Sequence, residues 1–324
     1  MSLMIDGKLR EDWLDAETEG GEFKRKESVF RHWVTPDGSA GPSGESGFQA
    51  EPGRYHLYVS YACPWAHRTL IFRKLKKLED LISLSVVHPY MGAEGWSFDA
   101  WPGATGDTVN GHRYMHQVYT RADPGYTGIV TVPVLWDKQR DTIVSNESAE
   151  IIRMLNSAFD AWGDASVDFY PEALRGEIDA INAEVYEKVN NGVYRTGFAS
   201  TQEAYEENFT RLFAMLDELE ERLSGQRYLV GERITEADWR LFTTLVRFDA
   251  VYVGHFKCNR RRIQDYPALS RFLRELYQWP GVAETVRLDH IKYHYYYSHV
   301  ELNPHRIVPL GPELDFMAKA GGQA

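Results

Sequence analysis

The chain has 324 residues, enough for two domains of ordinary size, and its formal net charge is −11. With 43% hydrophobic and 26% charged residues it has the composition of a folded globular protein, which excludes a fibrous or disordered chain. The acidic balance argues against nucleic acid and anionic membranes as partners, and no apolar run approaches the ~20 residues of a membrane helix. Two widely separated cysteines and no apolar signal segment predict a reducing, cytoplasmic location.

The first part of the chain is predicted to hold strands and one helix after an irregular start. Residues 1–50 are expected to form an irregular N-terminal extension, because Gly, Ser and Pro punctuate them. A strand is predicted over 55–60, then a helix that begins at Pro64, then a second strand over 82–88. The Gly- and Trp-rich residues 89–125 are expected to form a long connection, of a length that is uncommon unless it is functional.

The pattern changes from mixed to helical near residues 165–170. A hairpin is predicted over 131–137 and 142–144, followed by a helix from Ser148, which completes an α/β domain over 51–165. Residues 170–324 then read as an all-helical domain. Helices are expected at about 172–190, 202–223, 235–251, 267–278 and 282–297. Thr235 and Asp238 are spaced as in a capping box at the start of one of them.

Cys63 is the best candidate nucleophile. It lies directly after a predicted strand and at the start of a helix, where unpaired backbone N–H groups and the helix dipole favour a thiolate and lower the thiol pKa. Ala66 stands where a Cys-x-x-Cys motif would have its second cysteine, so no resolving thiol lies nearby in the sequence. Unless Cys258 folds back onto Cys63, this predicts a single-thiol nucleophile that an external thiol must regenerate. The alternative is a buried and inert cysteine.

Two further segments could bind a peptide-like ligand. A proline at the start of a strand, as in Val132-Pro133, can be cis and can present the backbone of Val132 to a ligand as an added strand would. At Glu147-Ser148 a helix N-terminus and the serine hydroxyl could hold a carboxylate, and Glu147 could pair with an ammonium group. Alternatively, these residues are an edge-strand proline and an ordinary helix cap.

These features together resemble a known family. The chain is similar to glutathionyl-hydroquinone reductases, the Xi-class glutathione transferases, over about residues 1–315. The resemblance implies an α/β thioredoxin-fold N-terminal domain followed by an all-α C-terminal domain, the glutathione transferase architecture, and a homodimer. The segments that carry it are Cys63-Pro64-Trp65-Ala66-His67, Asn190-Asn191-Gly192-Val193-Tyr194, Val251 to Asn259, and Asp289-His290-Ile291-Lys292 ahead of His294-Tyr295-Tyr296.

The resemblance also implies a reaction with glutathione as co-substrate. Cys63 would attack the glutathione sulfur of an S-glutathionyl-hydroquinone, release the hydroquinone and form a mixed disulfide that a second glutathione reduces. Tyr194 matches the family's proton donor, and Tyr252 matches a tyrosine that stabilises the thiolate. Tyr295 best matches a third, substrate-side tyrosine, and the run of tyrosines leaves the register between Tyr295 and Tyr296 open. The glutathione-binding residues implied by the family are Trp96, Ile129, Val130, Thr131, Val132, Pro133, Glu147 and Ser148.

Two other functions stay open at this stage. An omega-like thioltransferase or dehydroascorbate reductase would use the same cysteine without a carbon acid, and a non-catalytic glutathione-fold module would need no nucleophile. No Gly-rich phosphate loop appears, so no nucleotide cofactor is expected. His290, His294 and His299 have near-helical spacing, but the remaining ligands of a metal site are not evident, and no metal is expected.

Overall fold

The computed structural model describes residues 2–10 and 18–319, which form two compact units. The first, the α/β unit, contains residues 2–10 and 26–168. The second, the helical unit, contains residues 18–25 and 169–319, so the chain enters it early, leaves it, and returns. None of the described helices is long and apolar enough to cross a membrane. The parts of the predicted domains at 1, 11–17 and 320–324 lie outside the described residues.

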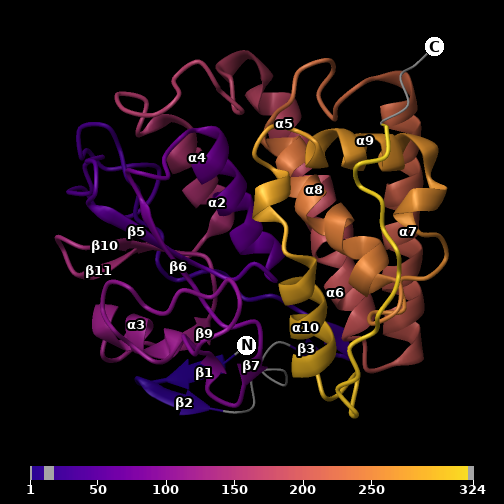
Figure 1. Ribbon diagram of the computed structural model, residues 1–324, viewed down its shortest axis with the longest axis horizontal. Helices are drawn as coiled ribbons and strands as arrows, with labels where there is room; N and C mark the ends of the chain where they lie inside the picture. Colours follow the sequence, from indigo (N-terminus) through magenta and orange to yellow (C-terminus); the bar gives the residue numbers. More distant parts are fainter. Residues whose placement is uncertain (1, 11–17, 320–324) are drawn as a thin grey trace. The chain divides into compact units, whose positions relative to one another are not determined.

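A four-stranded sheet with the order β11-β10-β5-β6 forms the centre of the α/β unit (Figure 1). Its strands are β5 (Tyr55–Val59), β6 (Ser83–Val86), β10 (Val134–Asp137) and β11 (Thr142–Ser145). β5 and β6 are parallel, whereas β10 runs antiparallel to both β5 and β11. This mixed arrangement is the predicted thioredoxin fold. Every residue of β5 and β10 is buried, as expected for strands covered on both faces.

Helices cover both faces of this sheet. Figure 1 shows α2 (Pro64–Leu75) and α4 (Ser148–Ser157) side by side on one face and α3 (Met115–Ala122) on the other. α2 follows β5 directly, and Pro64 occupies its first turn, where a missing N–H leaves no hydrogen bond unmade. Both β5–α2 and β11–α4 therefore place a helix N-terminus at the end of a strand.

The prediction of an irregular segment over residues 1–50 was wrong in part. β1 (Ser2–Ile5) pairs antiparallel with β2 (Lys8–Arg10) and with β9 (Gly128–Val130), which makes a second, three-stranded sheet. A small hairpin of β3 (Thr18–Glu19) and β4 (Glu22–Phe23) follows in the helical unit. These strands were missed because their partners lie far away in the chain or because each strand is only two or three residues long.

The long connection predicted over residues 89–125 contains secondary structure that the sequence analysis did not predict. It contains the hairpin of β7 (Met91–Gly92) and β8 (Gly95–Trp96) and the helix α3. α3 buries Met115, Val118 and Tyr119, which are spaced as one face of a helix. The surrounding Gly and Trp residues obscured this short pattern.

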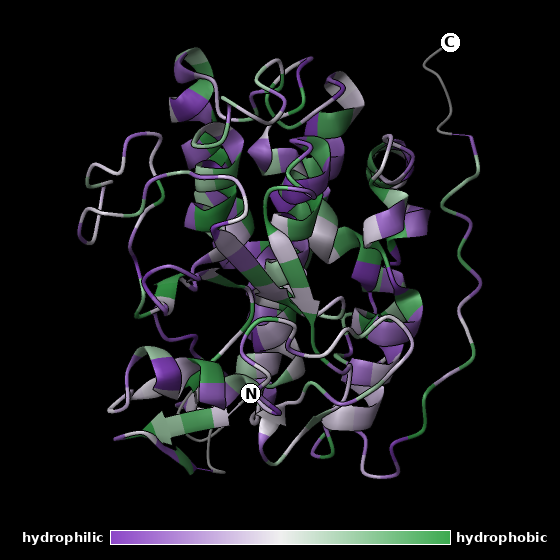
Figure 2. Ribbon diagram, turned by 60° about the vertical axis from the view of Figure 1, so that its left-hand side comes forward, coloured by the Kyte–Doolittle hydropathy of each residue, from purple (hydrophilic) through white to green (hydrophobic). Residues whose placement is uncertain are grey.

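The helical unit follows the predicted helices closely. Its α-helices are α5 (Arg175–Val185), α6 (Gly192–Gly197), α7 (Gln202–Gly225), α8 (Glu236–Arg247), α9 (Pro267–Tyr277) and α10 (Leu288–Ser298). Short 3₁₀ turns occur at Glu172–Leu174, Ile263–Asp265 and Ala283–Thr285. The last of these interrupts the single helix expected over 282–297. Green and purple alternate along the helices in Figure 2, as in amphipathic helices with one buried face.

The helical unit contains two π-helical turns. They occupy Tyr186–Asn190, just before α6, and Phe248–Tyr252, just after α8. A π turn inserts one residue into a helix and rotates the residues after it, and such turns are frequent at functional sites. The predicted capping box of Thr235 and Asp238 is confirmed at the start of α8. Burial raises the pKa of the Asp238 carboxyl to about 7.

Candidate active site

Cys63 occupies the strand-to-helix position that the sequence predicts. It is the N-cap residue of α2, with extended backbone angles, and its side chain is half-buried. Its carbonyl oxygen accepts the first helical hydrogen bond, from the His67 N–H at 3.0 Å. The sulfur therefore lies at the positive end of a helix, which favours a thiolate and hence nucleophilic attack.

The residue before Pro133 lies next to this sulfur. The Val132–Pro133 peptide bond is cis, as predicted, and the thiol of Cys63 lies 3.4 Å from the Val132 carbonyl oxygen, to which it donates. Tyr119 on α3 braces the segment, because its hydroxyl donates to the Thr131 carbonyl oxygen at 2.9 Å. The Asn146 amide donates in turn to the Tyr119 hydroxyl at 3.1 Å. A ligand bound along Val132 would lie beside the sulfur.

The other predicted clamp residues are already engaged within the α/β unit. Ile129 and Val130 pair with β1, and the Ile129 carbonyl oxygen accepts a hydrogen bond from the Tyr126 hydroxyl at 2.9 Å. Part of their backbone hydrogen-bonding capacity is thus used internally. Trp96 lies in β8 and is only 4% exposed.

Glu147 and Ser148 form the N-terminus of α4. Glu147 is its N-cap residue, and its carboxylate accepts hydrogen bonds from the Ala149 N–H at 3.0 Å and the Ser28 hydroxyl at 3.1 Å. The alternative of an ordinary helix cap is therefore met for Glu147. Ser148 is 3% exposed, and Arg68 of α2 donates to its hydroxyl at 3.3 Å. Arg68, a buried cation at this helix N-terminus, was not singled out in the sequence.

In the helical unit, three tyrosines from separate segments meet. The hydroxyls of Tyr194 and Tyr295 are 2.5 Å apart, and those of Tyr252 and Tyr295 are 3.1 Å apart. We call Tyr194, Tyr252 and Tyr295 the tyrosine cluster. α6 supplies Tyr194, the π turn after α8 supplies Tyr252, and α10 supplies Tyr295. The Phe256 ring packs directly against α6 at Gly197, and a side chain at that position would collide with the ring.

The three members of the tyrosine cluster differ in burial. Tyr252 and Tyr295 are 0% and 1% exposed, and burial raises the pKa of both hydroxyls well above the usual value. Arg247, itself fully buried, opposes that rise electrostatically for both. Tyr194 is the most exposed of the three, at 9%. The hydroxyls of Tyr252 and Tyr295 therefore stay protonated, and they connect by hydrogen bonds to Tyr194, the most exposed of the three.

The structure distinguishes Tyr295 from Tyr296. Tyr295 shares hydrogen bonds with both other members of the cluster, whereas the Tyr296 hydroxyl donates to the Ala250 carbonyl oxygen at 3.5 Å. Behind the cluster, His255 Nε2 and His299 Nδ1 lie 3.1 Å apart, and both rings contact Tyr295. Burial lowers the pKa of His255 to about 4 and that of His299 well below its usual value.

The helical and α/β units match two glutathione transferase domain families. The glutathione S-transferase N-terminal domain matches residues 62–158, and the C-terminal domain matches residues 202–275. The chain is 57% identical to the glutathionyl-hydroquinone reductase YqjG of Escherichia coli K12, over 97% of this chain and 96% of that protein. The glutathione-bound structure of YqjG superposes with a TM-score of 0.91 at 54% identity, over 99% of this chain and 98% of that one.

The chain belongs to the glutathionyl-hydroquinone reductases, the Xi-class glutathione transferases. An Xi-class transferase from Natrialba magadii gives a TM-score of 0.89 at 50% identity, over 98% of this chain and 95% of that one. A relative from Schizosaccharomyces pombe, 50% identical over 93% of this chain and 96% of that protein, is named glutathione S-transferase omega-like 2. Both of the enzyme families considered from the sequence thus appear among the names of relatives.

The second cysteine and the possible metal ligands of this Xi-class chain were also considered in the sequence. Cys258 is fully buried, and burial raises the pKa of its thiol far above the usual value, so it is a poor nucleophile. Among residues 2–10 and 18–319, no group of three His, Cys, Asp or Glu side chains is arranged to hold a metal ion.

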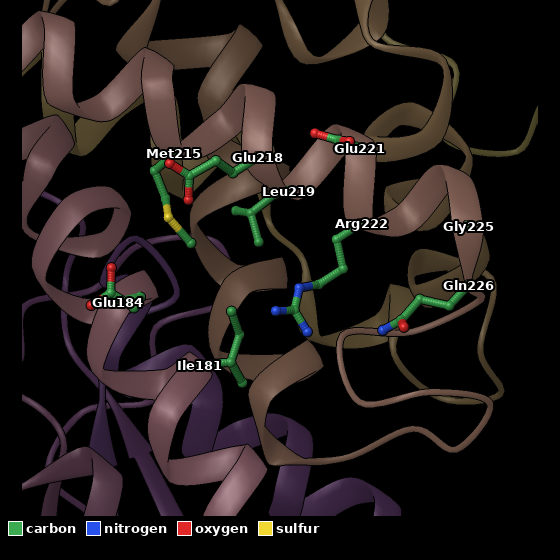
Figure 3. A pocket seen from close by; sticks show the side chains of 9 residues that line it. All are labelled: Ile181, Glu184, Met215, Glu218, Leu219, Glu221, Arg222, Gly225 and Gln226. Carbon is green, nitrogen blue, oxygen red and sulfur yellow. The ribbon is translucent and has the colours of Figure 1, made fainter.

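A surface groove of about 630 Å³ lies between α5 and α7 in the helical unit (Figure 3). Ile181, Met215 and Leu219 form its apolar part, and Glu184 and Glu218 stand beside them. It contains no nucleophile and none of the predicted site residues, so it is separate from the tyrosine cluster.

Proposed function

We propose that this protein reduces S-glutathionyl-hydroquinones to hydroquinones at the expense of glutathione, through a mixed disulfide on Cys63. The observation that carries the proposal is the tyrosine cluster, because a disulfide reductase has no need of a proton donor for carbon. The identity to glutathionyl-hydroquinone reductases supports the same reaction.

The reaction divides into two balanced steps. In the first, the Cys63 thiolate attacks the glutathione sulfur, a disulfide bond forms, and the carbon–sulfur bond breaks with its electron pair on the ring carbon. Tyr194 gives its hydroxyl proton to that carbon and becomes a phenolate. In the second, glutathione reduces the mixed disulfide and leaves as oxidised glutathione. Its thiol proton restores Tyr194, and Cys63 returns to the thiolate.

We assign roles to the remaining residues on the same basis. Tyr295 donates its hydroxyl hydrogen bond to the Tyr194 phenolate, and Tyr252 supports the Cys63 thiolate. Val132 holds the peptide backbone of glutathione beside Cys63. The N-terminus of α4, with Ser148, binds a glutathione carboxylate.

Four further residues complete the glutathione contacts. Glu147 can still pair with the ammonium group of glutathione, because a carboxylate oxygen accepts more than one hydrogen bond. Trp96, Ile129 and Val130 would contribute packing. We further propose a homodimer that works in the cytoplasm, where reduced glutathione is abundant.

Product analysis tests this function directly. The protein is incubated with glutathione and the glutathionyl conjugate of 1,4-hydroquinone, and products are identified by mass spectrometry. We expect free hydroquinone and oxidised glutathione in equal amounts. The second candidate, an omega-like thioltransferase, is favoured by the name of the S. pombe relative. It predicts reduction of glutathione mixed disulfides but an unchanged hydroquinone conjugate.

A further inference from the structure

The segment Thr18–Arg25 is attached to the tyrosine cluster although it lies in the N-terminal part of the chain. Phe23 is 1% exposed, and its ring centroid lies 6.3 Å from that of Tyr194 and 5.7 Å from that of Phe198. The Ser200 N–H donates to the Gly21 carbonyl oxygen at 3.1 Å. The hairpin therefore packs against Tyr194 of α6 and against the residues that directly follow this helix.

Arg25 ends this segment with its charge over the Tyr194 ring. Its guanidinium carbon lies 5.2 Å from the ring centroid of Tyr194 and 5.3 Å from that of Phe23. Its Nε donates to the Asn191 side-chain oxygen at 3.2 Å, which fixes the guanidinium in place. An arginine is always protonated in a protein, so a full positive charge faces the most exposed hydroxyl-bearing ring of the cluster.

We propose that Arg25 is a positioning residue for Tyr194, which holds its ring and stabilises the phenolate formed when Tyr194 protonates the departing carbon. This inference rests on the proposed function. A neutral tyrosine ring attracts a cation over its face, and a phenolate, whose negative charge spreads into the ring, attracts it more strongly. The interaction therefore grows along the reaction, as a contribution to catalysis must.

The other charged or titratable groups near the tyrosine cluster contact other members of it or are paired elsewhere. Arg247 acts on Tyr252 and Tyr295 from α8, and the His255–His299 pair contacts Tyr295 from the far side. Arg195 of α6 is paired with Glu187. Arg25, in contrast to these described groups, lies over the ring of the proposed proton donor itself.

Loss of the Arg25 charge should affect only the first step of the reaction. Arg25→Gln should slow release of hydroquinone from its glutathionyl conjugate in a single turnover by about 10-fold, within the range of a cation over an aromatic face. Reduction of the mixed disulfide of glutathione and 2-mercaptoethanol, which needs no carbon acid, should change less than 2-fold, as a rough bound. Arg25→Lys should recover most of the lost rate, because the charge is kept.

Two controls separate this role from a structural one. Arg175 lies over Tyr170 in the same unit, 5.0 Å from its ring centroid, and Arg175→Gln should leave both reactions unchanged. In a Tyr194→Phe background, Arg25→Gln should have no further effect, because no phenolate forms. Equal slowing by Arg25→Gln and Arg25→Lys, slowing of both reactions, or an additive double variant would overturn the proposal.

The outcomes also separate this inference from the proposed function. If Tyr194→Phe slows hydroquinone release and Arg25→Gln does not, the acid is correct and the role of Arg25 is wrong. If the wild-type protein releases no hydroquinone, the proposed function itself is wrong.

Discussion

The thiol site of the α/β unit and the tyrosine cluster of the helical unit are built in opposite ways. Around Cys63 the polar groups are mainly backbone: a helix N-terminus and the carbonyl oxygen of Val132. In the tyrosine cluster they are side-chain hydroxyls on three segments, packed among aromatic rings. The helix N-terminus at Cys63 is set by neighbouring residues, and one strand pairing brings Val132 to it, whereas the tyrosine cluster needs three segments of the helical unit to meet. Substitutions should therefore affect the two sites differently.

Loss of the nucleophile should have the largest effect. Cys63→Ser should lower the rates of both hydroquinone release and disulfide reduction on the order of 10⁴-fold or more, as when a nucleophile is removed from other enzymes. Cys258→Ser, the control, should retain most activity, because that thiol is buried. Intact-mass analysis after oxidised glutathione should show one adduct, on Cys63. An adduct found only on Cys258 would contradict the assignment.

Loss of the acid should separate the two reactions. Tyr194→Phe should slow hydroquinone release by about 10²- to 10⁴-fold, the contribution of a positioned acid, and disulfide reduction much less. Tyr296→Phe is the matched control, because its hydroxyl lies outside the tyrosine cluster. Equal losses in the two assays would favour the thioltransferase function.

Tyr252 tests whether the two sites are as distinct as their construction suggests. If it supports the thiolate, Tyr252→Phe should slow both reactions together by roughly 10- to 100-fold, the effect of one hydrogen bond to a charged group. Rates of both reactions, measured with the same enzyme preparation, check this. A loss confined to hydroquinone release would place Tyr252 in support of Tyr194 instead.

Acid should destabilise both units. The pKa of His56 in the α/β unit and of His255 in the helical unit are each lowered by burial to about 4. In the unfolded chain each histidine takes up a proton near pH 6.5, whereas in the folded protein it does so only near pH 4. The free energy of unfolding is therefore highest above pH 6.5 and falls as the pH is lowered toward 4. Each should contribute a loss on the order of 2 kcal/mol at pH 5. Urea unfolding at pH 7 and pH 5 measures it, and His56→Gln should lessen the difference. Equal stability at both values would show that the folded protein takes up these protons.

The smallest effect is expected at the helix N-terminus, where backbone groups share the binding. Ser148→Ala should raise the KM for glutathione by roughly 3- to 10-fold and leave kcat nearly unchanged, because a ground-state hydrogen bond is lost. Ser157→Ala, at the exposed end of the same helix, is the control. A fall in kcat alone would remove Ser148 from the glutathione site.

The same contrast explains how much the sequence could predict. The position of Cys63, the cis bond before Pro133 and the capping box of α8 follow from short local patterns, and all were predicted correctly. The pairing of β1 with β9 joins segments more than a hundred residues apart, and no local pattern announces it. The roles of the tyrosines came from family resemblance. The sequence alone did not show which of Tyr295 and Tyr296 faces the tyrosine cluster, because this depends on how α10 is rotated about its axis. Arg25 gave no signal, because it stands in the basic run Lys24-Arg25-Lys26, which resembles an ordinary solvated surface segment.

The early entry of residues 18–25 into the helical unit sets an order of events during synthesis. Phe23 and Arg25 leave the ribosome long before α6, which is made about 170 residues later. At roughly 5–20 residues per second, this hairpin waits on the order of ten to thirty seconds for its partner. The α/β unit can fold in that interval, whereas the helical unit is incomplete until the residues from 169 onward have been made. A helical unit produced alone from Phe169 onward would expose the faces of Tyr194 and Phe198 that Phe23 covers.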